Sequence, residues 1–381
     1  MLDLSHKIRF IFTLTVISFS LSGCSSKAPA FSFSGDAYSD GYSSIYQDTV
    51  FHLDENGMVK RLDYNSMQDV PLCNKPNCRH TADDCILNRL NGKVPVFAGS
   101  AAYYFVDEDP CFVQDEKGKP ELQLESSLFC YDFEKGKETK LFSLQDVSVS
   151  KNCYGLLLHD HILYFITNSL SRYYDENGVM LGYGGTGGEM HLYAYDLSEG
   201  KAADICRLYD ADQIKKYYPD VTSSGEVYMK GIFDNKIYFN VGFVAGEEKM
   251  YRFYVTYYDL TDKSYYGTPE DYGNIDFSSV NYVSDDYFLI CREGEASVYH
   301  KASSQPVVLK DPFFNQDVFP TVWEDTVFCH DKAFDLNNKA ARTLDFMRDK
   351  LVVAKYGDSF IISDTSMLYG FEKIPAEQLL K

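Results

Sequence analysis

The stretch Asp234-Asn235-Lys236-Ile237-Tyr238-Phe239, followed further along by Tyr258-Asp259-Leu260, carries the pattern that decides the fold. An Asp-Asn pair before an apolar, aromatic run is typical of a tight turn that leads into a β-strand. The second triplet ends another strand and opens a second turn, because an Asp side chain can bond the local backbone. One unit therefore reads strand, tight turn, strand, loop, strand, tight turn, strand.

Both motifs recur along the chain. Copies of the first motif are Gln47-Asp48-Thr49-Val50-Phe51, Asp160-His161-Ile162-Leu163, Asp285-Asp286-Tyr287-Phe288, Glu324-Asp325-Thr326-Val327, Gly357-Asp358-Ser359-Phe360 and the degenerate Ser100-Ala101-Ala102-Tyr103. Copies of the second are Tyr131-Asp132-Phe133, Tyr195-Asp196-Leu197, Phe334-Asp335-Leu336 and, more weakly, Leu62-Asp63-Tyr64 and Tyr299-His300-Lys301. Thr49 and Ser359 occupy matching positions six repeats apart, which makes the repeat about 52 residues long.

This repeat predicts an all-β chain folded as a β-propeller of four-stranded antiparallel blades. We expect seven blades, with six or eight as the alternatives, and place the propeller over residues 38–381. The content of 31 Tyr and 27 Phe also favours strands over helices. A β-sandwich is the main structural alternative, but it does not predict two turn motifs in alternation. The last unit lacks a clear fourth strand, and we expect Phe31 to Tyr38 to supply it by closing the ring.

Over about residues 40–375 the pattern resembles the propellers of lipoproteins from Gram-positive bacteria. It is also loosely similar to the propellers of TolB and of the low-density-lipoprotein receptor. The motifs are degenerate, so the resemblance implies the fold and no particular activity.

The N-terminus predicts a membrane anchor. Lys7 and Arg9 precede an apolar run from Phe10 to Leu21, which is too short to span a bilayer and is typical of a signal peptide. The run ends in Leu21-Ser22-Gly23-Cys24, which resembles the lipobox of bacterial lipoproteins and implies cleavage before Cys24 and a diacylglyceryl thioether on its sulfur. We therefore expect a signal peptide at 1–23, a lipid-anchored tether at 24–37 and a position on the extracytoplasmic side of the cell membrane. An ordinary secretory signal with an incidental Cys is the alternative.

Charge and missing motifs exclude several functions. The net charge of −20 repels phosphate backbones, so nucleic acid is excluded as a partner. The run Gly182-Tyr183-Gly184-Gly185-Thr186-Gly187-Gly188 lacks the Gly-Lys-Ser/Thr ending of a phosphate-binding loop and indicates only a flexible loop. The sequence contains neither Gly-x-Ser-x-Gly nor His-Glu-x-x-His, and we assign no catalytic residue.

The long connections predict a binding face. They fall between the second and third strands of a blade or between blades, at Asp107 to Ser126, Asn168 to Met190, Asp210 to Glu226 and Tyr266 to Ser279. Such connections share one face of a propeller, which usually binds the partner. The candidate ligand-binding residues are Asp107, Asp109, Tyr173, Tyr174, Tyr183, Tyr217 and Tyr218, among loop residues that also include Glu108, Phe112, Tyr272, Phe313 and Phe314. Aromatic rings beside carboxylates suit a glycan or a cationic peptide better than an anion. The alternative to a binding role is that tyrosine is simply common in this chain and that the acidic residues keep the protein soluble.

These observations favour a membrane-anchored binding or interaction module that presents a propeller face to a glycan, a peptide or an envelope partner. Two alternatives remain open. One is a polysaccharide hydrolase or lyase that uses the same face, and the other is a structural component of an envelope complex.

The segment 71–95 contains a candidate zinc site. Cys73, Cys78, His80 and Cys85 form a Cys₃His set, the complement of a structural, tetrahedral Zn²⁺ site. The spacing is loosely similar to that of zinc knuckles. We expect Cys85 to begin a short helix that runs to Leu90. A disulfide between two of the cysteines and simple free thiols are the alternatives, although the nine cysteines left after lipidation of Cys24 argue against a complete disulfide framework.

Overall fold

The structure of the protein is a computed structural model. It describes residues 37–39, 43–46, 49–54, 56–73, 75, 78–80, 85–90, 93–98, 100–107, 111–114, 120–123, 126–144, 151–169, 171–174, 180–184, 190–208, 211–223, 226–245, 250–268, 278–315, 318–348, 350–364 and 370–380. The predicted signal peptide and most of the predicted tether, including Cys24, lie outside these residues. Within the described part of the chain, no helix has both the length and the apolar character needed to cross a membrane.

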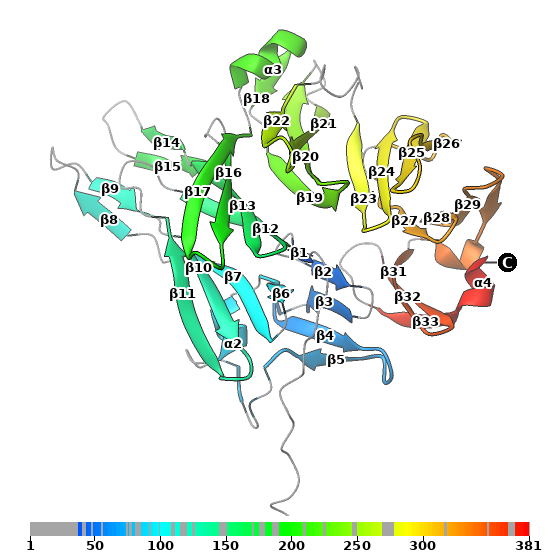
Figure 1. Cartoon of the computed structure of the whole chain (residues 1–381), viewed down its shortest axis with the longest axis horizontal. Coiled ribbons are helices and arrows are strands. Elements are labelled where there is room, and N and C mark those ends of the chain that lie inside the picture. Colours follow the sequence, from blue (N-terminus) through cyan, green and yellow to red (C-terminus); the bar gives the residue numbers. More distant parts are fainter. Residues whose placement is uncertain are drawn as a thin grey trace, which may run out of the picture.

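Seven antiparallel sheets follow one another around a ring, which confirms the predicted seven-bladed propeller (Figure 1). Blade 1 contains β2 (Ser43–Tyr46), β3 (Thr49–Leu53), β4 (Val59–Asp63) and β5 (Gln68–Pro71). Blade 2 contains β6 (Val96–Ala98), β7 (Ala101–Asp107), β10 (Ser126–Asp132) and β11 (Lys137–Ser143). Blade 3 contains β12 (Lys151–His159), β13 (Ile162–Ser169), β16 (Met190–Asp196) and β17 (Lys201–Arg207).

The second half of the chain supplies four more blades. Blade 4 contains β19 (Val227–Phe233), β20 (Lys236–Ala245), β21 (Met250–Asp259) and β22 (Ser264–Tyr266). Blade 5 contains β23 (Ser279–Val283), β24 (Tyr287–Arg292), β25 (Glu295–His300) and β26 (Val307–Lys310). Blade 6 contains β27 (Thr321–Trp323), β28 (Thr326–Cys329), β29 (Lys332–Asp335) and β30 (Ala341–Thr343), and the 3₁₀ helix η1 (Asp345–Met347) follows it. Blade 7 has three described strands, β31 (Lys350–Tyr356), β32 (Ser359–Asp364) and β33 (Glu372–Pro375), and ends in helix α4 (Ala376–Leu380).

The insertions have secondary structure of their own. The hairpin β8 (Cys111–Gln114) and β9 (Pro120–Gln123) interrupts blade 2 between its second and third strands. The hairpin β14 (Ser171–Tyr174) and β15 (Met180–Gly184) interrupts blade 3 at the same place. Helix α2 (Ile86–Leu90) lies between blades 1 and 2, whereas α3 (Ala211–Tyr217) and β18 (Val221–Ser223) lie between blades 3 and 4. In a propeller, all of these connections belong to one face, which we call the long-loop face.

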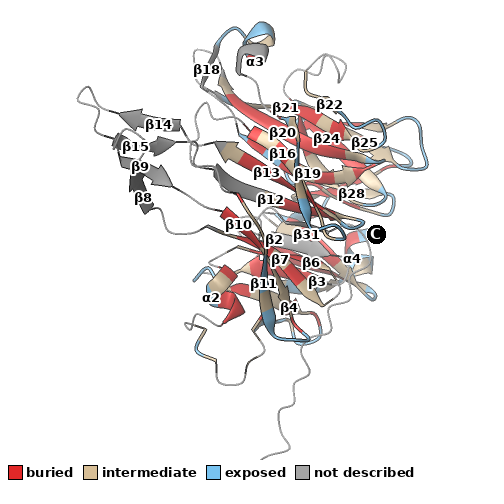
Figure 2. Ribbon diagram, turned by 60° about the vertical axis from the view of Figure 1, so that its left-hand side comes forward, coloured by how far each residue is buried: buried red, intermediate tan, exposed pale blue. Residues whose placement is uncertain are grey.

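Among the described residues, the core consists of seven clusters, one between each pair of adjacent blades. Alternate residues of each strand point to the two neighbouring blades, so every blade is buried on both sides. The cluster that closes the ring joins Val50 and Leu62 of blade 1 to Val353 and Ile361 of blade 7. Figure 2 shows the buried residues along the strands and the exposed ones mainly at the turns. The first and last blades are therefore held together by side-chain packing.

Of the predicted closing strand, the described residues Ala37 and Tyr38 do not pair with blade 7, and Phe31 to Asp36 lie outside the described residues. The short strand β1 (Ala37–Ser39) pairs with Leu156 to Leu158 of β12, on the inner edge of blade 3. Helix α4 follows the third strand of blade 7 instead, and Leu379 of this helix is fully buried in the cluster between blades 6 and 7. Because ring closure already buries an apolar interface, an additional strand from the N-terminus is not required for it.

The two turn motifs have the predicted structures. Asp234 and Asn235 have φ values of 50° and 57° between the paired residues Phe233 and Lys236, which is a two-residue turn with the left-handed backbone that Asp and Asn tolerate. In the second motif, Oδ1 of Asp259 accepts hydrogen bonds of 2.8 and 3.4 Å from the backbone N–H groups of Thr261 and Asp262. Equivalent bonds are made by Asp63, Asp132, Asp196 and Asp335. His300 Nδ1 replaces the carboxylate in blade 5, where it accepts a bond of 3.2 Å from the N–H of Ala302.

Candidate functional site

The Cys/His segment connects the outer strand of blade 1 to the inner strand of blade 2. It begins after β5, which ends at Pro71, and joins β6 at Val96. A backbone hydrogen bond of 3.3 Å from Cys78 N–H to the carbonyl of Lys75 forms a turn. Helix α2 begins at Ile86, and its first bond runs from Arg89 N–H to the carbonyl of Cys85. The predicted helix is thus present, one residue later than expected.

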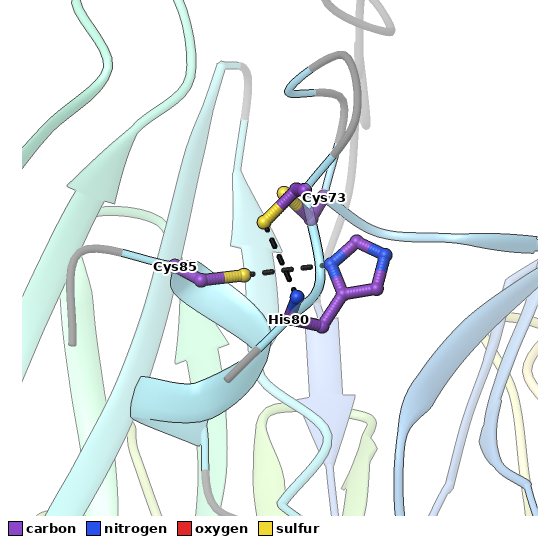
Figure 3. A group of neighbouring side chains, drawn as sticks. Cys73, His80 and Cys85 are labelled. Atoms are coloured by element: carbon purple, nitrogen blue, oxygen red, sulfur yellow. Dashed lines mark hydrogen bonds between the residues drawn. The ribbon is translucent and has the colours of Figure 1, made fainter. Parts of the chain in front are cut away.

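The four predicted ligands lie together. Their donor atoms all fall within 4.8 Å of one another, and Cys85 Sγ lies 3.6 Å from His80 Nδ1. Figure 3 shows the side chains of Cys73, His80 and Cys85 converging on one small volume at the start of α2. A tetrahedral zinc ion with Zn–S and Zn–N bonds of about 2.3 and 2.0 Å requires a separation of roughly 3.5 Å between a sulfur and a nitrogen ligand. The arrangement of these atoms can therefore bind a metal ion.

The surroundings of the cluster are asymmetric. Cys85 is fully buried and belongs to the core cluster between blades 1 and 2, together with Ile86, Leu87 and Leu90 of the helix. Burial raises the pKa of the Cys73 thiol to about 12. Cys78 differs, because the backbone N–H of His80 donates a bond of 3.4 Å to its sulfur and lowers its pKa. The site is thus anchored in the core on one side and reaches the surface on the other.

The backbone at His80 is in an unusual conformation that serves the cluster. Its φ of 60° lies in the left-handed region, which costs a non-glycine residue about 1 kcal/mol or more. This conformation accompanies the inward orientation of the imidazole and the bond from its own N–H to Cys78. The three cysteines are free thiols, as are Cys130, Cys206, Cys291 and Cys329 elsewhere in the described chain.

The predicted ligand-binding residues of the long-loop face do not form one described cluster. Asp107 ends β7, Tyr173 and Tyr174 lie on β14, and Tyr183 lies on β15. Their side chains lie outside the described part of the structure, as do Glu108, Asp109 and Tyr272 in full and the side chain of Phe112. Tyr217, at the end of α3, is half-buried.

Two aromatic residues expected in the loops belong to the core. The Tyr218 ring packs on Phe243 of β20 at a centroid distance of 4.7 Å. Phe314 is fully buried and contacts Phe334 of blade 6 at 4.8 Å, whereas its neighbour Phe313 is half-buried. Although both rings lie in connections between blades, their side chains therefore pack into the core instead of facing the solvent.

Sequence analysis missed two exposed tyrosines on the strands of blade 4. Tyr228 of β19 is 40 % exposed and Tyr251 of β21 is 37 % exposed. The period-two alternation of Tyr251 and Phe253 places both rings on one face of the strand, but the exposure of that face depends on how far the neighbouring blade extends.

A shallow pocket lies on the opposite face of the ring. It has a volume of about 210 Å³ between blades 4 and 5, and its lining includes Phe233, Asp234, Tyr238, His300 and Lys301. These residues come from the short turns of the two blades and the strand ends beside them, so the pocket is separate from the long-loop face.

Comparisons with known proteins add little to this description. No protein-family model matches the chain, and no curated protein matches it. Among solved structures, the monoclinic crystal form of an ACO/RPE65 chimera aligns over 88 % of this chain and 71 % of its own, at 9 % identity and a TM-score of 0.36. A Synechocystis ACO mutant gives the same coverage at 10 % identity and a TM-score of 0.35. TolB from Acinetobacter baumannii covers 93 % of this chain and 86 % of its own, at 14 % identity and a TM-score of 0.26. At such low identities and TM-scores these similarities carry no argument about function, and the propeller assignment rests on the strand pairing itself.

Proposed function

We propose that the chain is a lipid-anchored, extracytoplasmic binding module that uses the long-loop face of its propeller to hold a glycan, a peptide or an envelope protein. The propeller fold is a scaffold suited to a generic binding or interaction role. The observation that carries the proposal is the distribution of the insertions. The hairpins β8–β9 and β14–β15, the α2 segment and the α3–β18 segment all leave the ring on one face. On the opposite face, the described connections between strands are short turns, and helix α4 follows the last strand there.

The N-terminal sequence supports the anchoring part of this proposal. Its basic start, its short apolar run and Leu21-Ser22-Gly23-Cys24 are the features of a lipoprotein signal, and a diacylglyceryl group on Cys24 would hold an acidic protein at an anionic membrane that otherwise repels it. The tether that follows Cys24 would leave the ring free to meet partners outside the cell.

We further propose that the Cys₃His cluster holds a structural zinc ion. Four protein ligands complete a tetrahedral shell and leave no position for a reacting water, which is the arrangement of structural zinc sites. Zinc bound there would fix the segment between blades 1 and 2 through Cys73, Cys78, His80 and Cys85. It would thereby stabilise one part of the binding face.

A binding and release assay tests the main proposal. The purified protein is incubated with immobilised wall polysaccharides, host polysaccharides and envelope extracts, and both retention and released sugars are measured. We expect retention without release. Release of oligosaccharides would instead show a hydrolase or a lyase, and retention of none of these materials would contradict the binding proposal.

A further inference from the structure

The middle hairpin of blade 4 is longer than the blade beside it. Strands β20 and β21 have ten residues each, whereas β24 and β25, the middle hairpin of blade 5, have six each. At about 3.3 Å per residue, the extra four residues extend the hairpin roughly 13 Å beyond its neighbour. The extension lies at the end where β20 leads into β21, which is the long-loop face.

Along β20, Tyr238 and Asn240 contact the described strands of blade 5. Tyr238 stacks on Phe288 of β24 at a centroid distance of 4.1 Å. Two residues further on, the amide of Asn240 donates to the carbonyl of Val280 at 3.0 Å and accepts from its N–H at 2.7 Å. The next residue on this side of the strand is Gly242. Around it lie three aromatic rings and one carboxylate, which we call the blade 4 platform: Glu226, Tyr228, Tyr251 and Phe253.

The two sides of the extended hairpin differ. On the side toward blade 3, the insertion between blades 3 and 4 covers the strands, since Ile214 of α3 is buried and Tyr218 packs on Phe243. On the side that bears the platform, Tyr228 and Tyr251 are about 40 % exposed. Exposed aromatic rings that cluster on one face of a sheet are typical of an interaction site, whereas single exposed rings scattered over a surface are common in any protein.

Gly242 lets the ring of Tyr251 lie flat on the sheet. A Cβ at position 242 would lie 2.2 Å from the hydroxyl oxygen of Tyr251 and 2.6 Å from Cζ, so the ring crosses directly over the glycine. One face of this ring therefore rests on the backbone, while the residue as a whole is 37 % exposed. Phe253 meets it edge to face, at 5.0 Å and 85°, and supports it from the side.

Polar groups border the ring. The Tyr228 hydroxyl donates to the carboxylate of Glu226 and is also hydrogen-bonded to the Tyr251 hydroxyl. Burial and the bond to Glu226 raise the pKa of Tyr228, so this phenol stays protonated at neutral pH. Alternating donors and acceptors thus lie beside a flat apolar surface.

We propose that the blade 4 platform binds a neutral glycan, with a sugar ring stacked on Tyr251 and its hydroxyl groups bonded to Tyr228 and Glu226. This inference rests on the proposed binding function and names its ligand class and its residues. A sugar offers an apolar C–H face together with hydroxyls that both donate and accept, which matches a flat ring bordered by phenols and a carboxylate. Glu226 and the net charge of −20 disfavour an anionic polysaccharide.

The test measures the affinity of the full-length protein, in detergent, for soluble dextran, mannan, galactan and a β-glucan, with poly-lysine and hyaluronan as charged probes. We expect at least one neutral polysaccharide to bind and Tyr251→Ala to weaken that binding roughly tenfold. Gly242→Ala keeps every platform side chain but displaces the Tyr251 ring, so it should also weaken binding while the melting temperature stays within a few degrees.

Tyr266→Ala is the matched control. Tyr266 lies in the same blade, on β22, stacks on Tyr257 at 4.6 Å and donates to a carboxylate, that of Asp262, at 2.6 Å. It lies beside the short turn, away from the platform, so its loss should leave glycan binding unchanged. Equal binding by wild type and Tyr251→Ala would overturn the platform and leave the proposed function intact. Binding of poly-lysine alone would overturn the glycan assignment, and binding of none of the probes would overturn it as well.

Discussion

The backbone N–H of Leu260 donates a hydrogen bond of 2.8 Å to the carbonyl of Asn235. Asn235 lies in the turn between the first two strands of blade 4, and Leu260 begins the turn between the last two, so the bond ties the two turn motifs of one repeat together. The same bond joins Leu197 to His161 at 2.9 Å and Leu336 to Asp325 at 2.7 Å. Both turns are therefore fixed on one face of the ring, and this leaves the opposite face to the long insertions.

The turn at Asn235 should be sensitive to a β-branched residue. Asn235 has a φ of 57°, which Asn and Gly tolerate and Val does not. Asn235→Val should lower the free energy of unfolding by about 1 to 2 kcal/mol, and Asn235→Gly should leave it nearly unchanged. Chemical denaturation of the two variants measures the difference. Equal stability of both would show that this turn is not in the left-handed conformation.

Acid should weaken the turns of the second motif. Hydrogen bonds from the Ser198 hydroxyl and the Glu199 N–H hold the pKa of Asp196 below its usual 3.8, and bonds from Ser66 and Asn65 do the same for Asp63. A carboxyl whose pKa is lower in the folded state stabilises the fold above pH 3.8, and this contribution is lost as the pH falls through the folded pKa.

The melting temperature measured between pH 5 and pH 2.5 should therefore fall less for Asp196→Asn than for the wild type, because the amide keeps an acceptor oxygen but does not titrate. Asp220→Asn, an exposed residue after α3, serves as the control and should follow the wild-type curve. Coincident curves for all three proteins would contradict the role of Asp196.

The insertion of blade 3 should be dispensable for folding. Asn168 and Met190 are directly paired across β13 and β16, so an Asn-Gly turn can replace residues 169–189 without changing the register. We expect the free energy of unfolding to change by less than about 1 kcal/mol, since loop length has only a logarithmic effect.

Removal of residues 211–218 is the contrasting deletion. It takes away the buried Ile214 and the Tyr218 ring that packs on Phe243, so it should destabilise the protein by about 2 kcal/mol or more. If the first deletion abolished cooperative unfolding, β14 and β15 would have to be counted as part of the blade core.

The zinc proposal predicts about one zinc ion per chain when the protein is purified without a metal-affinity tag. His80→Ala should lose the ion, and His161→Ala, which removes a histidine from a tight turn, should keep it. Zinc at a thousandfold excess over its Kd would stabilise the folded state by about 4 kcal/mol, so a chelator should lower the melting temperature of the wild type but not of His80→Ala. Elemental analysis and thermal melts provide the two measurements. Metal-free protein with a Cys73–Cys85 or Cys78–Cys85 disulfide in its mass spectrum would contradict the proposal.

Anchoring is tested at Cys24. Cys24→Ala should abolish lipid attachment, so the variant should leave the detergent phase in a phase-partition experiment once the signal has been removed. Its melting temperature should match that of the wild type, because the lipid lies outside the propeller. Persistent partition into detergent after signal cleavage would show that Cys24 is not the attachment point.

Local sequence patterns specify the repeat, its turns and the candidate metal ligands. These features depend on atoms a few residues apart, such as Asp259 and the N–H groups of Thr261 and Asp262, so residue type and spacing specify them. Cys73, Cys78, His80 and Cys85 also lie within one short segment, which limits how far apart their side chains can be.

Which surfaces are covered depends on contacts between segments far apart in the chain. The pairing of Ala37–Ser39 with β12 joins residues more than a hundred positions apart, and Tyr218 is covered while Tyr251 is exposed because of where α3 packs and where blade 5 ends. Strand partners and solvent exposure depend on the relative lengths and positions of whole blades. Residue type, which is the same for Tyr218, Tyr228 and Tyr251, carries no information about them.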